Sequence, residues 1–197
     1  MATVGRQVRS VRLGSYAVVA GAASMSMLFA LEAQALGWGM PSPSQNFHGL
    51  WLVVILFTWV STSAWLSSLR TLAEDVVPEA PHRRSSMWTL LGWVVPIINL
   101  WFPYQVVADL VRAFDARVRG LLVWWAAWLV ATQLHVSDVV GNRGLAWTAG
   151  PKWVQVVAWA VGLLWWCWIV VELTRAAEAA ATSNTSPVPS VESAVTP

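Results

Sequence analysis

The chain has 197 residues, of which 57 % are hydrophobic and only 11 % are charged, and its mean hydropathy is +0.56. An ordinary soluble domain carries roughly a quarter of its residues charged, so this composition is typical of a membrane protein. The formal net charge of +2 comes without a dense basic cluster, which argues against a nucleic-acid partner. Cys167 is the only cysteine, so no disulfide can form within the chain.

Long segments with little or no charge follow one another along the chain. About 20 apolar residues cross the hydrocarbon core as a helix, so each segment is a candidate span. The segments cover residues 13–31, 49–69, 85–108, 120–134 and 153–171. The sequence therefore predicts an all-α protein, a polytopic transmembrane helical bundle over residues 13–175. A basic cytoplasmic tail at 1–12 is expected before it, and a disordered tail at 176–197 after it, because that composition is small, polar and rich in proline.

The first segment has a competing interpretation as a secretory signal. A basic start and an apolar stretch precede Ala33 and Ala35, which have the spacing of a cleavage site. Signal cores have about 7 to 15 apolar residues, and the stretch from Leu13 to Leu31 is longer. The prediction is a retained span.

Proline residues interrupt the third segment, at Pro96 and Pro103. In a continuous helix each proline leaves a carbonyl without its usual donor, and the bilayer core supplies no substitute. A re-entrant third segment would place all but two of the twelve Lys and Arg residues on the side of the N-terminus, whereas five full spans would place all but four there. The positive-inside rule favours the first arrangement. We therefore predict four spans plus a proline-broken re-entrant or interfacial segment, with both termini cytoplasmic; the alternative is five spans.

Beyond Pro103 the pattern changes to that of an amphipathic helix, as expected for a helix at the membrane interface. The expected apolar face consists of Val107, Leu110, Val111, Phe114 and Val118, and the opposite face of Gln105, Asp109, Arg112 and Arg119.

The interrupted stretch is also the candidate structural or polar site. Irregular backbone at membrane depth is tolerated only where protein buries it or water reaches it. The candidate residues are Gly92, Trp93, Pro96, Asn99, Trp101, Pro103, Tyr104 and Gln105. One interpretation is helix architecture, with Asn99 satisfying a freed carbonyl; the other is a small polar binding site.

A resemblance to a known family lies in the same stretch and the segment after it. The shared features are Gly92-Trp93, Pro96, Asn99-Leu100-Trp101, Pro103-Tyr104-Gln105 and the later pair Trp124-Trp125. With these features the chain resembles the domain of unknown function 4328 family of bacterial, largely actinobacterial, membrane proteins. The upstream stretch at 65–75 departs from the family by lacking a second Arg and an Asn. The resemblance implies a bacterial membrane location and supplies no activity.

Sequence patterns for catalysis or metal binding are absent. His48, His82 and His135 fall in different segments or loops, and no metal, nucleophile-elbow or phosphate-loop motif occurs. Glu32 lies at the outer end of the first segment, where it reaches the interface or holds a buried ion or proton. We expect no enzymatic activity, no cofactor and no metal.

Sixteen tryptophans are the largest anomaly of composition. Trp59, Trp93, Trp128 and Trp159 are expected at depth, where each indole N–H needs an acceptor. The candidate acceptors are carbonyls beside Pro96 and Pro103 and the hydroxyls of Thr58, Ser61 and Thr62. Bulky packing between spans is one interpretation, and an aromatic groove for a lipid or quinone-like ligand is the other. The pairs Ala17/Gly21 and Ala20/Ser24 predict close-packing faces on the first helix.

These patterns together predict an integral protein of the bacterial cytoplasmic membrane that serves as a non-catalytic interaction or accessory protein. The alternative is a transport or sensing protein for a small solute, a lipid or a quinone. The expected partners are membrane lipids, with other membrane proteins or a second copy of the chain as further candidates, and no nucleic acid.

Overall fold

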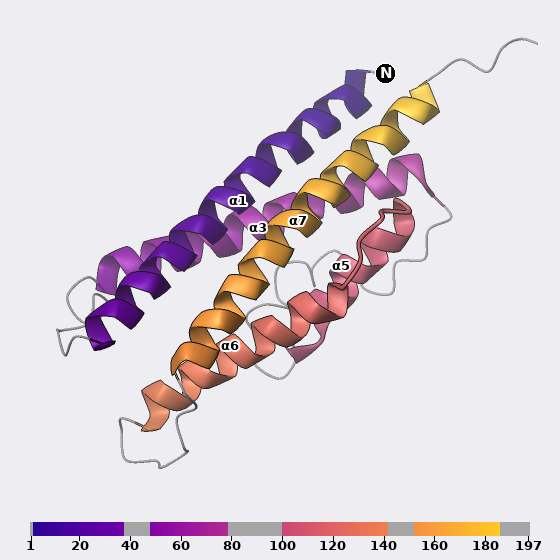
Figure 1. Ribbon diagram of the computed structural model, residues 1–197. Coiled ribbons are helices and arrows are strands. Elements are labelled where there is room, and N and C mark those ends of the chain that lie inside the picture. Colours follow the sequence, from indigo (N-terminus) through magenta and orange to yellow (C-terminus); the bar gives the residue numbers. More distant parts are fainter. Residues whose placement is uncertain (1, 38–47, 79–99, 142–151, 186–197) are drawn as a thin grey trace, which may run out of the picture.

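The computed structural model describes residues 2–37, 48–78, 100–141 and 152–185. These residues contain no strand and form five α-helices, which confirms the predicted all-α class. The helices are α1 (Ala2–Gly37), α3 (His48–Val76), α5 (Phe102–Ala113), α6 (Leu121–Gly141) and α7 (Lys152–Thr185). The helices α1, α3, α6 and α7 are long, and the short helix α5 lies beside them (Figure 1).

Each of the four unbroken predicted segments lies almost wholly inside one long helix. Three helices are long and apolar enough to cross a membrane, over Thr3–Leu28, Gly49–Val76 and Val156–Asn184. Among the described residues α6 adds a shorter apolar helix over Leu121–Thr132. Of the third predicted segment, 85–108, only residues 100–108 belong to the described part of the chain.

Small residues allow α1 to pack closely on α3. A Cβ placed on Gly21 would lie 3.0 Å from Thr58 Oγ1 and 3.2 Å from Thr58 Cα, and a Cβ on Gly14 would lie 3.2 Å from the Trp65 ring. Gly21 therefore belongs to a close-packing face, as predicted. Ala20 and Ser24, the other predicted pair, are exposed, so that prediction is wrong for the packing within this chain.

The N-terminal end of α1 and the C-terminal ends of α3 and α7 meet at one end of the bundle (Figure 1). Gln7 Nε2 donates to Asp75 Oδ2 at 2.6 Å, which joins α1 to α3. Asn184 Nδ2 donates to the backbone oxygen of Val76 at 2.7 Å, which joins α7 to α3. The two ends of the described chain therefore lie on the same side of the molecule.

Both predicted tails are helical where the structure describes them. Residues 2–12 belong to α1, and Val11 is fully buried. The predicted disordered tail from residue 176 is wrong over residues 176–185, because α7 continues to Thr185 and buries Ala177 and Ala181. Alanine has the highest helix propensity and its small side chain permits close helix contact, so this stretch orders without bulky apolar residues.

Helix α5 packs against α3 and α6 through Val106, Val107 and Leu110. Two expectations for its faces are wrong. Asp109, expected on the polar face, is only 7 % exposed, and its Oδ1 accepts from Arg112 Nη2 at 2.7 Å. The helix ends at Ala113, so Val118 lies beyond it in an irregular stretch that contains the left-handed residue Asp115.

Candidate functional site

The predicted site residues divide between described and undescribed parts of the chain. Gly92, Trp93, Pro96 and Asn99 lie outside the described residues. Trp101, Pro103, Tyr104 and Gln105 begin α5, where Trp101 is the N-cap residue and Pro103 falls in the first two positions of the helix. A proline is well suited to that place, because its missing N–H would have no partner in the first turn anyway.

The turn before α5 provides an acceptor for an indole. Trp125 Nε1, on α6, donates to the Leu100 carbonyl at 3.2 Å. Gln105 N donates to the next carbonyl, that of Trp101, at 3.1 Å. A carbonyl close to Pro103 thus serves a buried tryptophan, as expected from the sequence, although the donor is Trp125 and not one of the four tryptophans expected at depth.

Three of the predicted site residues line one open groove, which we call the α5 groove. It has a volume of about 300 Å³. Its walls include Leu100, Trp101, Tyr104, Gln105, Arg112 and Trp125. Pro103 is buried and does not line it. The structure therefore brings Trp101, Tyr104 and Gln105 together with a cation that sequence analysis had not placed among the site residues.

A row of aromatic rings leads from this groove into the bundle. The centroids of Tyr104 and Trp125 are 6.4 Å apart, those of Trp125 and Trp124 are 5.3 Å apart, and those of Trp124 and Trp166 are 4.8 Å apart with nearly parallel planes. Trp65 closes the row with its ring edge against Trp166 at 5.9 Å. The two neighbouring tryptophans of α6 therefore have different positions, Trp125 at the groove and Trp124 deeper in the bundle.

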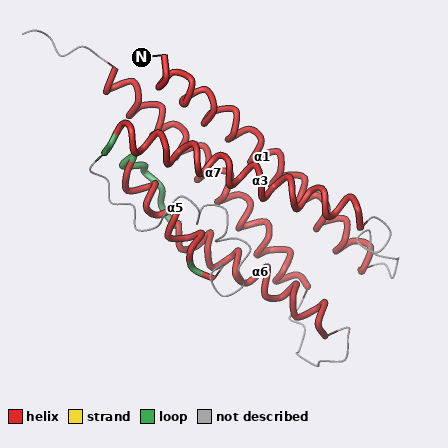
Figure 2. Tube along the Cα trace, turned by 180° about the vertical axis from the view of Figure 1, so that it is seen from behind, coloured by secondary structure: helices red, strands yellow, loops and turns green. Residues whose placement is uncertain are grey.

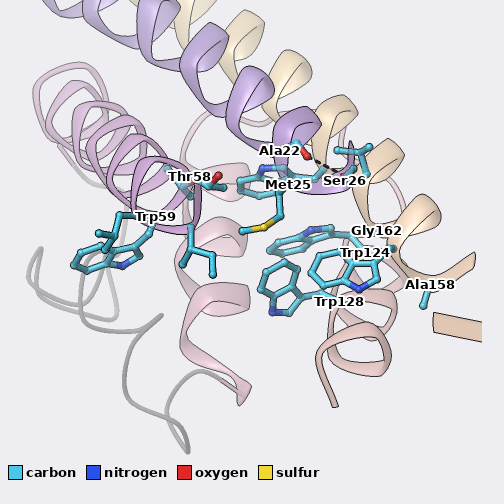
Figure 3. A pocket seen from close by; sticks show the side chains of 15 residues that line it. Ala22, Met25, Ser26, Thr58, Trp59, Trp124, Trp128, Ala158 and Gly162 are labelled. Carbon is cyan, nitrogen blue, oxygen red and sulfur yellow. Dashed lines mark hydrogen bonds between the residues drawn. The ribbon is translucent and has the colours of Figure 1, made fainter. Parts of the chain in front are cut away.

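Trp124 belongs to the wall of a larger space, which we call the tryptophan cavity. Helices α1, α3, α6 and α7 enclose about 450 Å³ between them. Five tryptophans line it: Trp59, Trp124, Trp128, Trp159 and Trp166. Figure 3 shows Met25 of α1 and the rings of Trp124 and Trp128 converging on this space.

The chemistry of the cavity wall is apolar. No charged side chain lines it, and two of its hydroxyl groups, those of Thr58 and Ser26, donate to carbonyls of their own helices. Thr58 Oγ1 donates to the Val54 carbonyl at 2.8 Å, and Ser26 Oγ donates to the Ala22 carbonyl at 2.9 Å. An apolar group fits such a space, whereas a polar or charged group would lose its hydration without gaining partners.

The side of the cavity lies between two helices that make little contact with each other. Helix α3 packs mainly on α1 and α7, and α6 packs mainly on α7. Ile55 and Leu56 of α3 line the cavity and are partly exposed. In a bilayer, this gap would face acyl chains.

Sequence analysis identified part of this wall. Trp59, Trp128 and Trp159 were expected at depth, and all three line the cavity. The small residues Ala22 and Gly162, which leave the space open, were missed because a small residue in a span predicts helix packing as readily as a cavity.

No group of three or more His, Cys, Asp or Glu is placed to hold a metal among the described residues. The side chains of Glu32, His48, His82 and His135 lie outside what the structure describes.

No curated protein and no solved structure matches the chain. A family model described as a domain of unknown function (DUF4328) matches residues 44–170, which is more than half of the chain. The matched residues include all five tryptophans of the cavity and the whole α5 groove. The chain therefore belongs to the domain of unknown function 4328 family.

Proposed function

We propose that the chain is a non-catalytic integral protein of the bacterial cytoplasmic membrane, and that it binds the apolar part of a lipid or quinone-like molecule in the tryptophan cavity. The observation that carries this proposal is an uncharged, tryptophan-lined space of about 450 Å³ between α1, α3, α6 and α7. Ligand pockets commonly have volumes of about 300 to 1,000 Å³ and mostly apolar walls.

The arrangement of polar groups favours lipid binding over transport of a polar solute. A polar solute or ion needs side chains that converge on one cavity from several spans. Here the hydroxyls of Ser26 and Thr58 donate within their own helices. In this proposal the protein is an accessory protein that holds or senses a membrane lipid. Its partner is another membrane protein or a second copy of the chain, which would respond to whether the cavity is occupied.

Tryptophan fluorescence offers a direct test of ligand binding, because five of the sixteen indoles surround the cavity. We expect a short-chain quinone, and separately a nitroxide-labelled fatty acid, to quench the purified protein saturably in detergent. Acrylamide, which quenches without a site, is the control. Quenching by the two lipids that rises linearly with their concentration, without saturation, would reduce the effect to partition into the micelle and contradict the proposal.

The same proposal includes a topology of four spans, formed by α1, α3, α6 and α7, with both termini in the cytoplasm. The end of the bundle that holds both termini also carries Arg6, Arg9, Arg12, Arg70 and Arg175. In Figure 2 the irregular stretch between α5 and α6, which carries Arg117 and Arg119, lies toward the same end. The positive-inside rule assigns this end to the cytoplasm.

Single cysteines in a Cys167→Ala background would test the topology in intact cells. We expect Thr71→Cys and Arg117→Cys to be protected from an impermeant thiol reagent, and Gly49→Cys, at the opposite end of α3, to be labelled. All three positions are exposed in the structure. Labelling at residue 117 with protection at residue 71 would mean an odd number of crossings between them, and five spans would replace four.

A further inference from the structure

The α5 groove has one apolar end and one cationic end. Leu100 and Trp101, where α5 begins, are 42 % and 57 % exposed. Arg112 lies three turns later in the same groove, about 16 Å along the helix axis at 1.5 Å per residue. Helix α5 runs in the same general direction as the long helices (Figures 1 and 2) and does not cross them. One leaflet of the hydrocarbon core is about 15 Å thick, so in a membrane-spanning bundle the groove would match the distance from the acyl region of a leaflet to its headgroups.

The guanidinium of Arg112, at the cationic end, is held in place by hydrogen bonds that use only some of its N–H donors. Arg112 Nη2 donates to the buried Asp109 carboxylate at 2.7 Å, and Arg112 Nε donates to the Ala108 carbonyl at 3.1 Å. A guanidinium has five N–H donors. The other three, including both on Nη1, have no partner among the described residues, and the side chain is 51 % exposed. This geometry leaves a positioned fork for an anionic group with two oxygens.

The remaining walls show which anion suits the groove. Tyr104 and Gln105 add polar groups beside the fork, and no carboxylate lines the groove. A zwitterionic headgroup would bring a cation close to Arg112, and the groove offers no carboxylate to pair with it. Residues 102–120 carry three arginines against two aspartates, so the surroundings also favour an anion.

From these observations we propose that the α5 groove binds an anionic phospholipid, with its phosphodiester at Arg112 and its acyl chain along Trp101 and Trp125. This site is separate from the tryptophan cavity, and its occupant is a lipid of the surrounding leaflet. It gives α5 a function beyond its packing against α3 and α6, because a bound lipid would hold the helix at the depth where its groove matches the leaflet.

Native mass spectrometry of the detergent-purified protein can test the proposal with equal amounts of dioleoylphosphatidylglycerol and dioleoylphosphatidylcholine. We expect phosphatidylglycerol adducts to dominate for the wild type. Arg112→Gln should lower the ratio of the two adducts about tenfold, the factor expected when one charged hydrogen bond is lost. Arg112→Lys, which keeps the charge but not the fork, should give an intermediate ratio.

Arg175→Gln is the matched control. Arg175 also pairs with a carboxylate three residues earlier, Glu172 at 3.0 Å, and is 71 % exposed, but it does not line the groove. Its variant should keep the wild-type ratio. A wild-type ratio in Arg112→Gln, or an equal loss in Arg175→Gln, would overturn the proposal. If Arg112→Gln does not fold, a wild-type ratio in Arg112→Lys would overturn the role of the fork.

A soluble competitor separates a lipid site from a phosphate site. Glycerol phosphate carries the same anionic group without an acyl chain. At equal concentration it should not displace phosphatidylglycerol, because it has nothing to place along Trp101 and Trp125. Full displacement would show a site for free phosphate and would contradict the assignment to a lipid.

Discussion

Gly162→Leu is expected to weaken binding of a lipid or quinone to the tryptophan cavity at least about tenfold, equivalent to about 1.4 kcal/mol. Gly162 lies in the wall of the cavity. A Cβ there would lie 3.8 Å from Ala127 Cβ and from the backbone nitrogen of Trp128, which is an ordinary van der Waals contact. The backbone therefore accepts a side chain at this position. Because Gly162 lines the cavity, the rest of the leucine side chain is expected to extend into it and to take the place of the ligand.

Two further variants separate occupancy of the cavity from an effect on the helix. Gly162→Ala adds only the methyl group that fits, so its quenching curve should stay close to that of the wild type. Ala160→Leu adds the same side chain to an exposed position of α7 and should leave the affinity unchanged. An unchanged quenching midpoint for Gly162→Leu, in a protein that remains monodisperse with a normal Tm, would place the ligand elsewhere.

Deletion of residues 176–197 is expected to destabilise the protein by about 2 to 3 kcal/mol. The deletion removes the buried Ala177 and Ala181 and the hydrogen bond from Asn184 to the Val76 carbonyl. Burial of one methyl group contributes about 0.8 kcal/mol and one hydrogen bond about 1 kcal/mol. For a chain of this size the Tm in detergent should fall by about 4 to 12 °C.

A shorter deletion provides the control. Removal of residues 186–197 takes away none of the contacts described above and should leave the Tm within about 2 °C of the wild type. Glu178→Gln removes the ion pair with Arg12, whose N···O distance is 2.7 Å. Because solvent screens the exposed arginine, this variant should lower the Tm much less than the long deletion does. Equal Tm values for the long and the short deletion would show that residues 176–185 contribute nothing to the bundle.

The wrong prediction of disorder for residues 176–185 shows what a local sequence pattern cannot indicate. Residues 176–181 read "AAEAAA" and have too little apolar surface to predict a core contact. Their burial depends on α1, which packs along α7 and pairs Arg12 with Glu178. A neighbour that lies far away in sequence cannot be seen in a local pattern, so the helix was interpreted as a disordered tail.

The α5 region was predicted better, because its signals are local. Pro103 both removes a donor and suits the first turn of a helix, and the structure begins α5 at Phe102. The apolar positions Val107 and Leu110 are buried as their spacing predicts. For Asp109 the same reasoning gave the wrong face. Its ion pair with Arg112 stabilises the carboxylate where α5 packs against the neighbouring helices.

The sequence by itself determined the class of protein, its family, and the positions of its long helices. Hydropathy over about 20 residues indicates a candidate span, because a helix of about that length covers the hydrocarbon core of a typical bilayer. The family resemblance depended on uncommon residues at set spacing, such as Trp124 and Trp125. Only the tertiary structure decided that Trp124 lines the tryptophan cavity and Trp125 the α5 groove, and that Gly162 and Ala22 leave a cavity open. The physical reason is that a cavity belongs to several helices at once, so its volume depends on their distances and rotations, which no single segment encodes.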